Sequence, residues 1–545
     1  MIPPRNDQKV SPYSSVRKAA VKLDLNENRM GPSTKVIEAI RNVKDKDIFT
    51  YPDYAELTAK IAEYLNVNSK NVLLTNGADD AIRCVLDTYL DKGDKMLIPE
   101  PTFTMFEILG NLRGANIVKV PYNKDLSFPI EKFIEALPQK KVVVIVNPNN
   151  PTGTSITRDE IVKILCGAAM VILDETYHHF LKKSDVDLIK EFENLCVVQS
   201  FSKLFGLAGL RLGYIISNRK NIENLRKVIL PFPVNSLAVI AGIAALADKN
   251  YIEKTVKKID EEKEFLKNGL EGKVFQTQTN FLLVNFGRLS SRIHQKLMEK
   301  NILVKDLNSY PLLEGYLRIT VGTREENKIL LETLKRIMPP EAILFDMDGV
   351  LVDVSSSYRL AIKETAEHFL KMEIDPEEIK YYKKKGYNDD WKLTKKIISS
   401  HGGTVPLDKV IKKFQSLYLN GLIENEKWLL DKELLTKLKK EYKTGIVTGR
   451  PYAEAKYALE KFRVEKFFDA LIAKEDAPEK PDPSGINLAL EKLGVKRAVY
   501  IGDNIDDVKA AKSAGVTSIA IGEKNLLEAG AKIILKNVND IEDVL

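Results

Sequence analysis

The chain has 545 residues, which at about 150 residues per domain predicts three to four folding units. A hydrophobic fraction of 44% and a charged fraction of 29% exclude a mostly disordered chain, and 29 glycines with 23 prolines exclude a collagen-like one. The 83 Lys and Arg exceed the 76 Asp and Glu by only seven, so the charge does not indicate a nucleic-acid-binding protein. Three widely spaced cysteines, Cys84, Cys166 and Cys196, fit a reducing compartment, and we expect a cytoplasmic protein.

Neither a secretory signal nor a membrane span is expected. The first ten residues are polar and contain no apolar core segment. The most apolar stretch, residues 228–247, is interrupted by Pro231, Pro233 and Asn235, which favours a buried helix over a membrane span. The lysine run at residues 383–385 is interpreted as a solvated helix face.

Two stretches of the chain alternate short β-branched runs with helical patterns, which predicts α/β folds with parallel sheets and helices on both faces. The runs lie at residues 141–146, 171–173 and 196–198 in the first stretch, and at 342–345, 444–447 and 498–501 in the second. Pro339 and Pro340 cannot continue a helix, so we expect domains at residues 1–338 and 341–545.

The second stretch contains a long insertion at about residues 355–441, rich in Lys and Glu and helical in pattern. An insertion in this place predicts a mobile cap over a site at the strand ends. In open α/β sheets, ligands bind at the carboxyl ends of the strands, so we expect the chemistry of both stretches in the loops that follow the apolar runs.

One lysine of the first stretch lies in a setting suited to an anionic aldehyde cofactor. Lys203 is flanked by Ser200 and Ser202, and Arg211 follows eight residues later. The hydroxyls and the guanidinium can hold a phosphate while the lysine forms an imine. Asp174 ends an apolar run, where a carboxylate is costly without a cationic partner such as a protonated pyridine nitrogen.

Further residues of the first stretch fit the same ring. Tyr177 and Asn150 follow strand runs and can hydrogen-bond a ring hydroxyl, and Phe103 can stack on the ring. The backbone amides of residues 76–79 precede a helical pattern and suit a phosphate. Taken singly, Asp174 is also explained as a helix cap, Asn150 as a turn residue and Phe103 as core. Their joint occurrence in this order on one α/β framework favours a cofactor site.

The set resembles the fold-type I pyridoxal-phosphate aminotransferases, and is closely similar to the histidinol-phosphate aminotransferase family over nearly all of residues 1–338. The family-specific pieces lie at residues 12–17 (PYSSVR), 25–28 (LNEN), 51–53 (YPD) and 317–323 (LRITVGT). The resemblance implies pyridoxal 5'-phosphate as the cofactor, a large domain at about residues 30–240 and a small domain formed by the remainder.

The resemblance also implies a role for each residue. Lys203 is the imine-forming base, Asp174 pairs with the pyridine nitrogen, and Asn150 and Tyr177 hold the ring hydroxyl, with Phe103 stacked on the ring. The cofactor phosphate is expected to contact Ala78, Asp79, Ser200, Ser202 and Arg211, together with Tyr51 of a neighbouring subunit, which implies a homodimer. The phosphate end of the substrate is expected at Tyr13 and Arg318, with Asn280 in the matching substrate-side segment.

Two positions depart from the family pattern. The family commonly has an arginine where this chain has Lys305, and lysine offers a point charge rather than a planar fork to a phosphate. Phe103 replaces a usual tyrosine and keeps the stacking surface. Similar enzymes include threonine-phosphate decarboxylases and aminotransferases of aromatic amino acids, which leaves these substrate classes open.

Two aspartates open the candidate site of the second stretch. Asp346 and Asp348 follow the apolar run at 342–345, and Gly349 allows the chain to turn. Asp346 can attack phosphorus, while Asp348 can protonate the leaving alcohol and later activate water. Two carboxylates this close repel each other unless a cation lies between them or one is protonated.

Later strand ends supply the remaining parts of a phosphate site. Asp503 and Asp507 complete, with Asp346 and Asp348, a set of oxygen ligands suited to Mg²⁺. Thr448 and Lys480 supply a hydroxyl and a cation for the phosphoryl oxygens. A turn, a helix cap and ordinary surface positions are the structural alternatives for these residues taken singly.

In this order the motifs DxDG, a strand-end Thr, Lys-Pro and GDxxxD resemble the haloacid-dehalogenase superfamily of phosphatases. This resemblance implies a Rossmann-like core with a helical cap over residues 341–545.

Together the two resemblances imply a bifunctional enzyme of histidine biosynthesis. The first domain would convert imidazole acetol phosphate and glutamate into histidinol phosphate and 2-oxoglutarate. Histidinol phosphate is a phosphate monoester, the class that the second domain would hydrolyse with Mg²⁺. Two alternatives stay open: a phosphatase that acts on an unrelated phosphate ester, and a non-enzymatic regulator that senses pyridoxal phosphate, for which a DNA-binding module is not evident.

Overall fold

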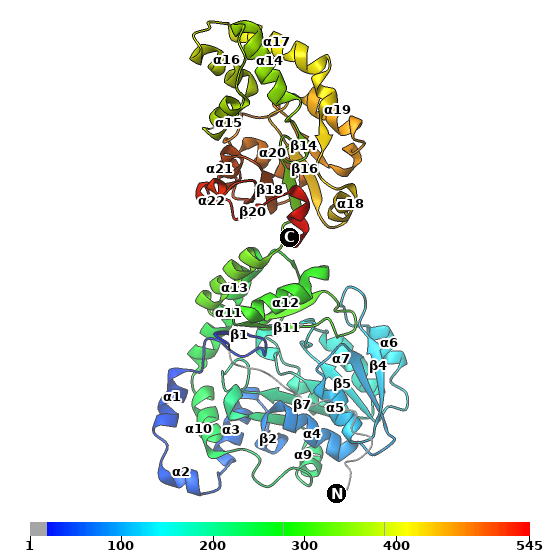
Figure 1. The fold of residues 1–545 in the computed structure, drawn as a ribbon. Coiled ribbons are helices and arrows are strands. Elements are labelled where there is room, and N and C mark those ends of the chain that lie inside the picture. Colours follow the sequence, from blue (N-terminus) through cyan, green and yellow to red (C-terminus); the bar gives the residue numbers. More distant parts are fainter. Residues whose placement is uncertain (1–18, 276, 386, 388, 545) are drawn as a thin grey trace, which may run out of the picture. The chain divides into compact units, whose positions relative to one another are not determined.

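The computed structural model describes residues 19–275, 277–385, 387 and 389–544 of the chain. They belong to two units, of which the first ends at Met338 and the second begins at Pro339 (Figure 1). Each unit has its own sheets and its own hydrophobic core, so each is described by itself.

A seven-stranded sheet forms the centre of the first unit. Its neighbouring strands run parallel, except that β8 is antiparallel to both β2 and β7. The three apolar runs singled out in the sequence form β5, β6 and β7, which are buried along their whole length. In spatial order the strands are β2 (Val72–Thr75), β8 (Gly213–Ser217), β7 (Leu195–Ser200), β6 (Val171–Asp174), β5 (Val142–Val146), β3 (Lys95–Glu100) and β4 (Asn116–Pro121).

Helices cover both faces of this sheet, and successive residues of each strand serve the two cores. On β5, Val143 and Ile145 belong to one core, whereas Val142, Val144 and Val146 belong to the other. This period of two is that of a strand buried on both sides, as the α/β prediction requires. The first core includes α1 (Thr34–Arg41), α3 (Ala55–Leu65), α6 (Ile130–Glu135), α7 (Arg158–Gly167) and α10 (Ser236–Leu246), and the second includes α4 (Gly77–Tyr89), α5 (Met105–Leu112) and α9 (Arg219–Leu225).

A five-stranded sheet forms the smaller part of the first unit. Its order is β1 (Val21–Leu23), β11 (Ile302–Asp306), β12 (Tyr316–Thr320), β10 (Phe281–Asn285) and β9 (Lys273–Phe275), and only β1 and β11 are parallel. A capping box of Thr323 and Glu326 starts the last helix on this sheet. The helices that pack on it are α11 (Lys249–Gly269), α12 (Ser290–Glu299) and α13 (Arg324–Ile337).

The second unit is built on a six-stranded parallel sheet. Its order is β17 (Ala470–Ile472), β16 (Lys443–Val447), β13 (Ala342–Phe345), β18 (Ala498–Gly502), β19 (Thr517–Ile521) and β20 (Ile533–Leu535). Because β13 lies between β16 and β18, the loops after these three strands meet at one edge of the sheet. The helices on its two faces are α18 (Lys432–Glu441) and α19 (Tyr452–Lys461) on one side, and α20 (Ser484–Leu493) and α21 (Ile505–Ser513) on the other.

The helical insertion of the second unit enters and leaves through a short hairpin. β14 (Val352–Asp353) pairs in antiparallel fashion with β15 (Lys427–Trp428). Between them lie α14 (Tyr358–Leu370), α15 (Pro376–Lys384), α16 (Asp390–Ser400) and α17 (Leu407–Leu419), drawn at the top of Figure 1. In contrast, α18 packs beside β16 of the sheet. We therefore propose residues 354–426 as the cap, a shorter segment than the expected 355–441.

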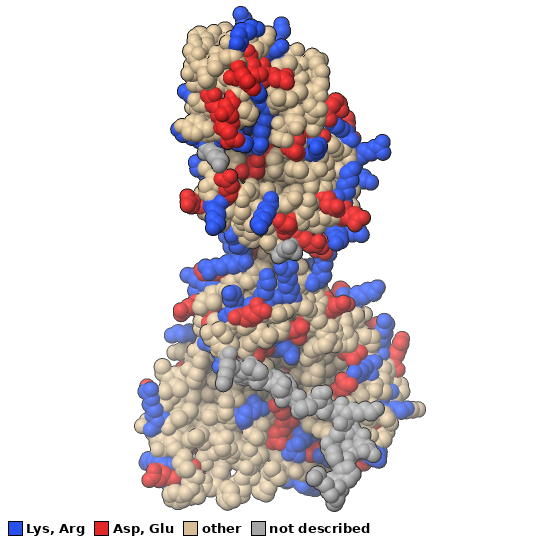
Figure 2. Space-filling view, viewed as in Figure 1, with Lys and Arg blue, Asp and Glu red and all other residues tan. Residues whose placement is uncertain are grey.

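Within the described part of the chain, no helix has the length and apolar character needed to span a membrane. The apolar stretch at residues 228–247 contains α10, whose inner residues pack in the first core. Lys and Arg side chains alternate with Asp and Glu over much of the face seen in Figure 2.

Candidate active sites

Most of the predicted cofactor residues of the first unit line one cavity, which has a volume of about 240 Å³. It lies where β5, β6 and β7 end and where the small sheet contributes β11 and β12. The predicted residues in its lining are Ala78, Asp79, Phe103, Asn150, Asp174, Tyr177, Ser200, Ser202, Lys203, Arg211, Lys305 and Arg318.

Two further predicted residues of the first unit, Asn280 and Tyr51, lie outside this lining. Asn280 is buried and donates through Nδ2 to the carbonyl of Asn26, a residue of the cavity lining, at 3.0 Å. Tyr51 is exposed on the surface and stacks on Phe232 with 4.2 Å between the ring centroids. Tyr13 lies outside the residues that the structure describes.

Asp174 is the last residue of β6, and its carboxylate is buried at the cavity. Its Oδ1 accepts hydrogen bonds from the backbone nitrogen and the hydroxyl of Thr176, at 3.0 and 2.6 Å. Burial raises the pKa of Asp174 to about 6 because it removes water from the charged form. A buried carboxylate of this kind is stabilised by a cation, so the site fits a protonated pyridine nitrogen.

Close backbone packing joins the start of α4 to the loop between β7 and β8. A Cβ on Gly213 would lie 2.5 Å from the backbone carbon of Gly77, so this position requires glycine. Gly77 has a positive φ of 80°, which favours glycine there. The guanidinium of Arg211 pairs with Asp79 at 2.9 Å. This cation, the first amides of α4 and the two serine hydroxyls after β7 together suit a phosphate group.

Lys203 brings a primary amine next to a phenol in the same cavity. Its Nζ donates to the carbonyl of Leu25 at 3.0 Å and lies 5.6 Å from the centre of the Tyr177 ring. The Tyr177 hydroxyl accepts a hydrogen bond from Asn26 Nδ2 at 2.8 Å. A backbone carbonyl is a weak partner for an amine, which leaves this lysine able to react with a carbonyl group.

Two cations from the small sheet complete the cavity. Lys305 on β11 and Arg318 on β12 lie directly opposite each other in the strand register. Arg318 donates to Asn150 Oδ1 and to the carbonyl of Asp24, each at 2.5 Å. Burial and the neighbouring guanidinium lower the pKa of Lys305. Adjacent cations of this kind favour an anionic group on the substrate.

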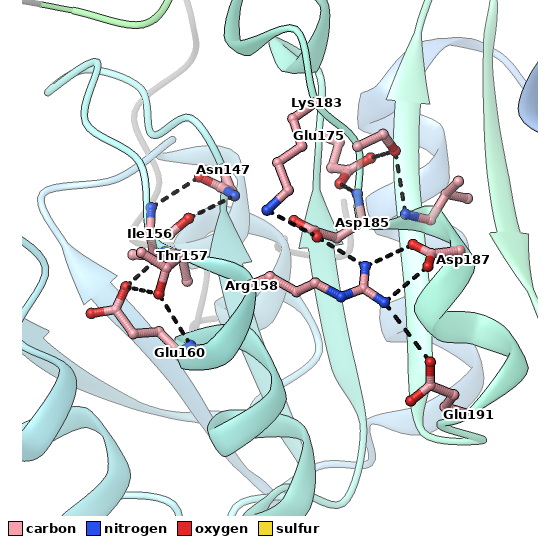
Figure 3. Close-up of polar contacts among 12 residues, drawn as sticks. Asn147, Ile156, Thr157, Arg158, Glu160, Glu175, Lys183, Asp185, Asp187 and Glu191 are labelled. Atoms are coloured by element: carbon pink, nitrogen blue, oxygen red, sulfur yellow. Dashed lines mark hydrogen bonds and ion pairs between the residues drawn. The ribbon is translucent and has the colours of Figure 1, made fainter.

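A network of polar side chains supports the end of β6 (Figure 3). Glu175 accepts hydrogen bonds from the Ser184 hydroxyl, the Asp185 backbone nitrogen and the Gln199 side chain, at 2.5, 2.7 and 2.7 Å. Arg158 binds the side chain of Asp185 at 3.1 Å. Burial raises the pKa of Glu175 to about 7. The network holds the strand that carries the aspartate of the candidate cofactor site.

The second unit has a cavity of about 580 Å³ between the sheet edge and the cap. Asp346, Asp348, Gly349, Lys480 and Asp503 line it from the sheet side. Two predicted residues lie just behind this lining. Thr448 is buried and accepts a hydrogen bond from the Arg450 backbone nitrogen, and Asp507 is buried against Lys480.

Three carboxylates form a compact cluster at this edge. Asp346, Asp503 and Asp507 have carboxylate oxygens within 4.8 Å of one another. Lys480 Nζ bridges two of them, at 2.7 Å from Asp346 Oδ1 and 2.6 Å from Asp507 Oδ1. Burial and the neighbouring carboxylates raise the pKa of Asp346 well above its usual range and that of Asp503 to about 7. Hard oxygen donors that repel one another in this way fit Mg²⁺.

The carboxylate of Asp348, predicted as a fourth metal ligand, lies outside this cluster. It pairs instead with Arg450, whose Nε donates to Asp348 Oδ1 at 2.5 Å. Gly349 turns the chain with a positive φ of 76°, and a Cβ there would lie 2.1 Å from Asp503 Oδ2. The turn expected at Gly349 therefore lets Asp503 approach the loop closely.

Lys383 and Arg450 are among the charged residues of this cavity that were not predicted from the sequence. Lys383 lines the cavity from α15 and pairs with Asp390 at 2.5 Å, so the interpretation of residues 383–385 as a solvated face is wrong for Lys383. Arg450 also lines the cavity, and only its place two residues after Thr448 at the same strand end was a signal.

The two folds and their sites define an enzyme with a fold-type I aminotransferase unit followed by a haloacid-dehalogenase-type unit. The Aminotransferase class I and II family matches residues 18–334, and the Haloacid dehalogenase-like hydrolase family matches residues 343–521. The chain belongs to the aminotransferase class I and II family, and its second unit is a haloacid dehalogenase-like hydrolase domain. Both resemblances drawn from the sequence are confirmed.

Several relatives of the first unit are named histidinol-phosphate aminotransferase. The chain is 35% identical over 334 residues to the histidinol-phosphate aminotransferase of Methanococcoides burtonii, which covers 60% of this chain and 93% of that protein. The solved histidinol-phosphate aminotransferase of Clostridium acetobutylicum is 25% identical with a TM-score of 0.55, covering 58% of this chain and 98% of that one. The fold is also shared by the Sinorhizobium meliloti histidinol-phosphate aminotransferase in complex with pyridoxal-5'-phosphate, at 24% identity and a TM-score of 0.55 over 59% of this chain and 91% of that one.

Proposed function

We propose that the first unit binds pyridoxal 5'-phosphate in the 240 Å³ cavity and transfers an amino group from glutamate to imidazole acetol phosphate, giving histidinol phosphate and 2-oxoglutarate. The observation that carries this proposal is the buried Asp174 carboxylate, whose raised pKa fits a cationic ring nitrogen. The shared name of the relatives supports the choice of substrate.

Each residue of the cavity has its own role in holding the cofactor or moving a proton. The bound cofactor supplies an electron sink for bond breaking next to the amino group. Asp174 keeps the pyridine nitrogen protonated, and Lys203 Nζ moves the proton to and from the reacting carbon. Asn150 and Tyr177 hold the ring hydroxyl, and Phe103 packs on the ring. The cofactor phosphate is held by Ala78, Asp79, Ser200, Ser202 and Arg211.

The substrate phosphate meets the paired cations of the small sheet. Arg318 provides a fork of donors and Lys305 a point charge beside it. Asn280 supports this side through its bond to the Asn26 carbonyl. Tyr13, on a segment outside the described residues, is proposed as a further phosphate contact.

The surface around Tyr51 supports the proposal of a homodimer through the first unit. Tyr51 and Phe49 are 78% and 77% exposed, and Leu230 and Phe232 are exposed beside them. The surface over α3 and α10 is mainly uncharged in Figure 2. An exposed apolar area of this kind is typical of a subunit interface. Across it, Tyr51 would contact the cofactor phosphate of the neighbouring subunit.

We propose that the second unit hydrolyses phosphate monoesters with Mg²⁺ held by Asp346, Asp503 and Asp507. A carboxylate oxygen of Asp346 attacks phosphorus and becomes an aspartyl phosphate, which water then hydrolyses. Asp348 protonates the leaving oxygen in the first step and activates the water in the second. Lys480 and Thr448 stabilise the phosphoryl oxygens.

We propose further that histidinol phosphate, the product of the first unit, is the substrate of the second. Joining the two sites on one chain raises the local concentration of one around the other. The test is to incubate the full chain with imidazole acetol phosphate, glutamate and Mg²⁺ and to follow histidinol and free phosphate together. Asp346→Asn, which keeps the transaminase residues intact, is the control and should accumulate histidinol phosphate.

The result separates this proposal from its alternative. Phosphate release from histidinol phosphate at the rate of the Asp346→Asn control would show that the phosphatase acts on another ester. Failure to form histidinol phosphate at all would refute the transaminase proposal.

A further inference from the structure

Arg450 is a buried arginine to which the proposed chemistry gives no role. Its side chain is 1% exposed, and a guanidinium stays charged in proteins, so burial requires carboxylates around it. Two are present. Arg450 Nε donates to Asp348 Oδ1 at 2.5 Å, and Nη1 donates to Glu426 Oε2 at 3.1 Å. One partner is the proposed general acid, and the other belongs to the chain that returns from the cap.

The contact with Asp348 uses only one of its two oxygens. Nε and Nη2 of Arg450 both lie 2.5 Å from Oδ1. Among the described residues, none donates a hydrogen bond to Oδ2. A protonated carboxyl group accepts hydrogen bonds on its carbonyl oxygen. Because Arg450 donates to Oδ1, the proton of the acid form belongs on Oδ2. The Asp348 side chain also lines the cavity, where a leaving group can reach it.

On its other side, Arg450 meets both chain connections of the cap. Glu426 Oε1 accepts hydrogen bonds from Ser357 and Tyr418, at 3.1 and 2.9 Å. The Arg450 guanidinium lies 4.9 Å from the centre of the Tyr358 ring, which stacks on Tyr418 at 4.4 Å. Tyr358 begins α14 at the entry to the cap, and Glu426 directly precedes β15 at its exit.

We propose that Arg450 is a positioning residue for Asp348. It holds this carboxylate through Oδ1, so that Oδ2 delivers a proton to the leaving group. It also links the carboxylate to both chain connections of the cap. The inference rests on the proposed phosphatase chemistry. In the step concerned, a bond forms between an Asp346 oxygen and phosphorus while the bond from phosphorus to the leaving oxygen breaks. The proton on Asp348 Oδ2 goes to the leaving oxygen, which departs as a neutral alcohol.

The test compares two aryl phosphates that differ in their need for this proton. Phenolate is a poor leaving group, since its conjugate acid has a pKa of about 10 as in tyrosine, whereas 4-nitrophenolate leaves without protonation. In single-turnover experiments with the full chain and Mg²⁺, Arg450→Lys keeps the charge but loses the hydrogen bond from Nε to Asp348 Oδ1. We expect phenol release to slow by about 100-fold and 4-nitrophenol release by less than about threefold.

Two further variants sharpen the comparison. Glu426→Gln leaves Arg450 in place but removes its second carboxylate, and we expect the same selective loss at about a tenth of the size. Arg463→Lys, at an exposed arginine after α19, is the matched control and should change neither rate. Retained 4-nitrophenol release also shows that a variant is folded and that Asp346 is competent.

Equal losses with both esters would overturn the inference, because a merely structural role affects both rates alike. Unchanged phenol release in Arg450→Lys would overturn it as well. A wild-type chain inactive toward both esters would refute the phosphatase proposal itself, whereas a chain that rejects only histidinol phosphate leaves this comparison intact.

Discussion

Replacing Lys480 by methionine removes the cation that holds two carboxylates of the second unit together. Lys480 Nζ lies 2.7 Å from Asp346 and 2.6 Å from Asp507, and the three side chains are 17%, 9% and 1% exposed. Methionine matches the apolar stem of lysine but lacks the terminal ammonium, so the carboxylate cluster is left without a cation. Asp346 and Asp507 then repel each other and Asp503 in a site with little water.

The size of the effect follows from this geometry. Breaking a buried ion pair by removing one partner costs about 3–5 kcal/mol. With an assumed urea dependence of about 2.5 kcal/mol per molar, the unfolding midpoint of the second unit should fall by about 1–2 M. Mg²⁺ at about 100 times its dissociation constant stabilises a folded site by about 2.7 kcal/mol, so it should recover much of this loss.

The assay can observe the second unit alone. Both tryptophans of the chain, Trp391 and Trp428, belong to that unit, so their fluorescence during urea unfolding does not report the first. Lys480→Met and wild type are compared in chelator and in excess Mg²⁺. Lys437→Met is the matched control, because Lys437 is exposed on α18 and its partner Glu542 is 3.5 Å away.

A midpoint shift no larger than that of Lys437→Met would refute the view that Lys480 neutralises the cluster. A midpoint of Lys480→Met that Mg²⁺ does not raise above its value in chelator would refute the assignment of these carboxylates as the metal site.

Three further predictions concern the first unit. Burial raises the pKa of Glu175 to about 7 from the ordinary 4.5, so the folded state retains a proton that the unfolded state releases. The free energy of unfolding should therefore fall by about 3 kcal/mol as the pH rises from about 4.5 through 7. Glu175→Gln lacks this carboxyl group, so calorimetry of the variant should not show this contribution. Lys305→Arg adds a planar fork for the substrate phosphate and should lower KM about fivefold at unchanged kcat in steady-state assays; a higher KM would contradict this. Asp174→Asn removes the partner of the ring nitrogen and should slow 2-oxoglutarate formation at least about 100-fold, and a loss below about threefold would disprove the role.

The strand-end residues were predictable because a charge that closes a buried apolar run is unusual. Asp174 and Asp346 both stand out in this way, and most of the residues predicted around each of them line a cavity. The α/β fold, the aminotransferase family and the hydrolase domain were predictable on the same basis, since each depends on short patterns that recur at strand ends.

The Arg450 network was not predictable, because its members are polar residues in segments that resemble solvent-exposed helices and turns. Asp348 and Arg450 are 102 positions apart, and Glu426 lies in an insertion rich in Lys and Glu. Charge alternation in such a segment usually indicates a solvated face. Only folding shows that Glu426 and Lys383 turn inward, Glu426 to a buried site and Lys383 to the cavity.

The central position of β13 has a consequence for synthesis on the ribosome. β13 is the first strand of its unit to emerge, but its partners β16 and β18 begin at Lys443 and Ala498, about 100 and 150 residues later. At about 5–20 residues per second, both edges of an apolar strand stay unpaired for several seconds. The first unit is complete by then and can fold, so the nascent second unit exposes an unpaired apolar strand at a stage when the first unit can already bury its own.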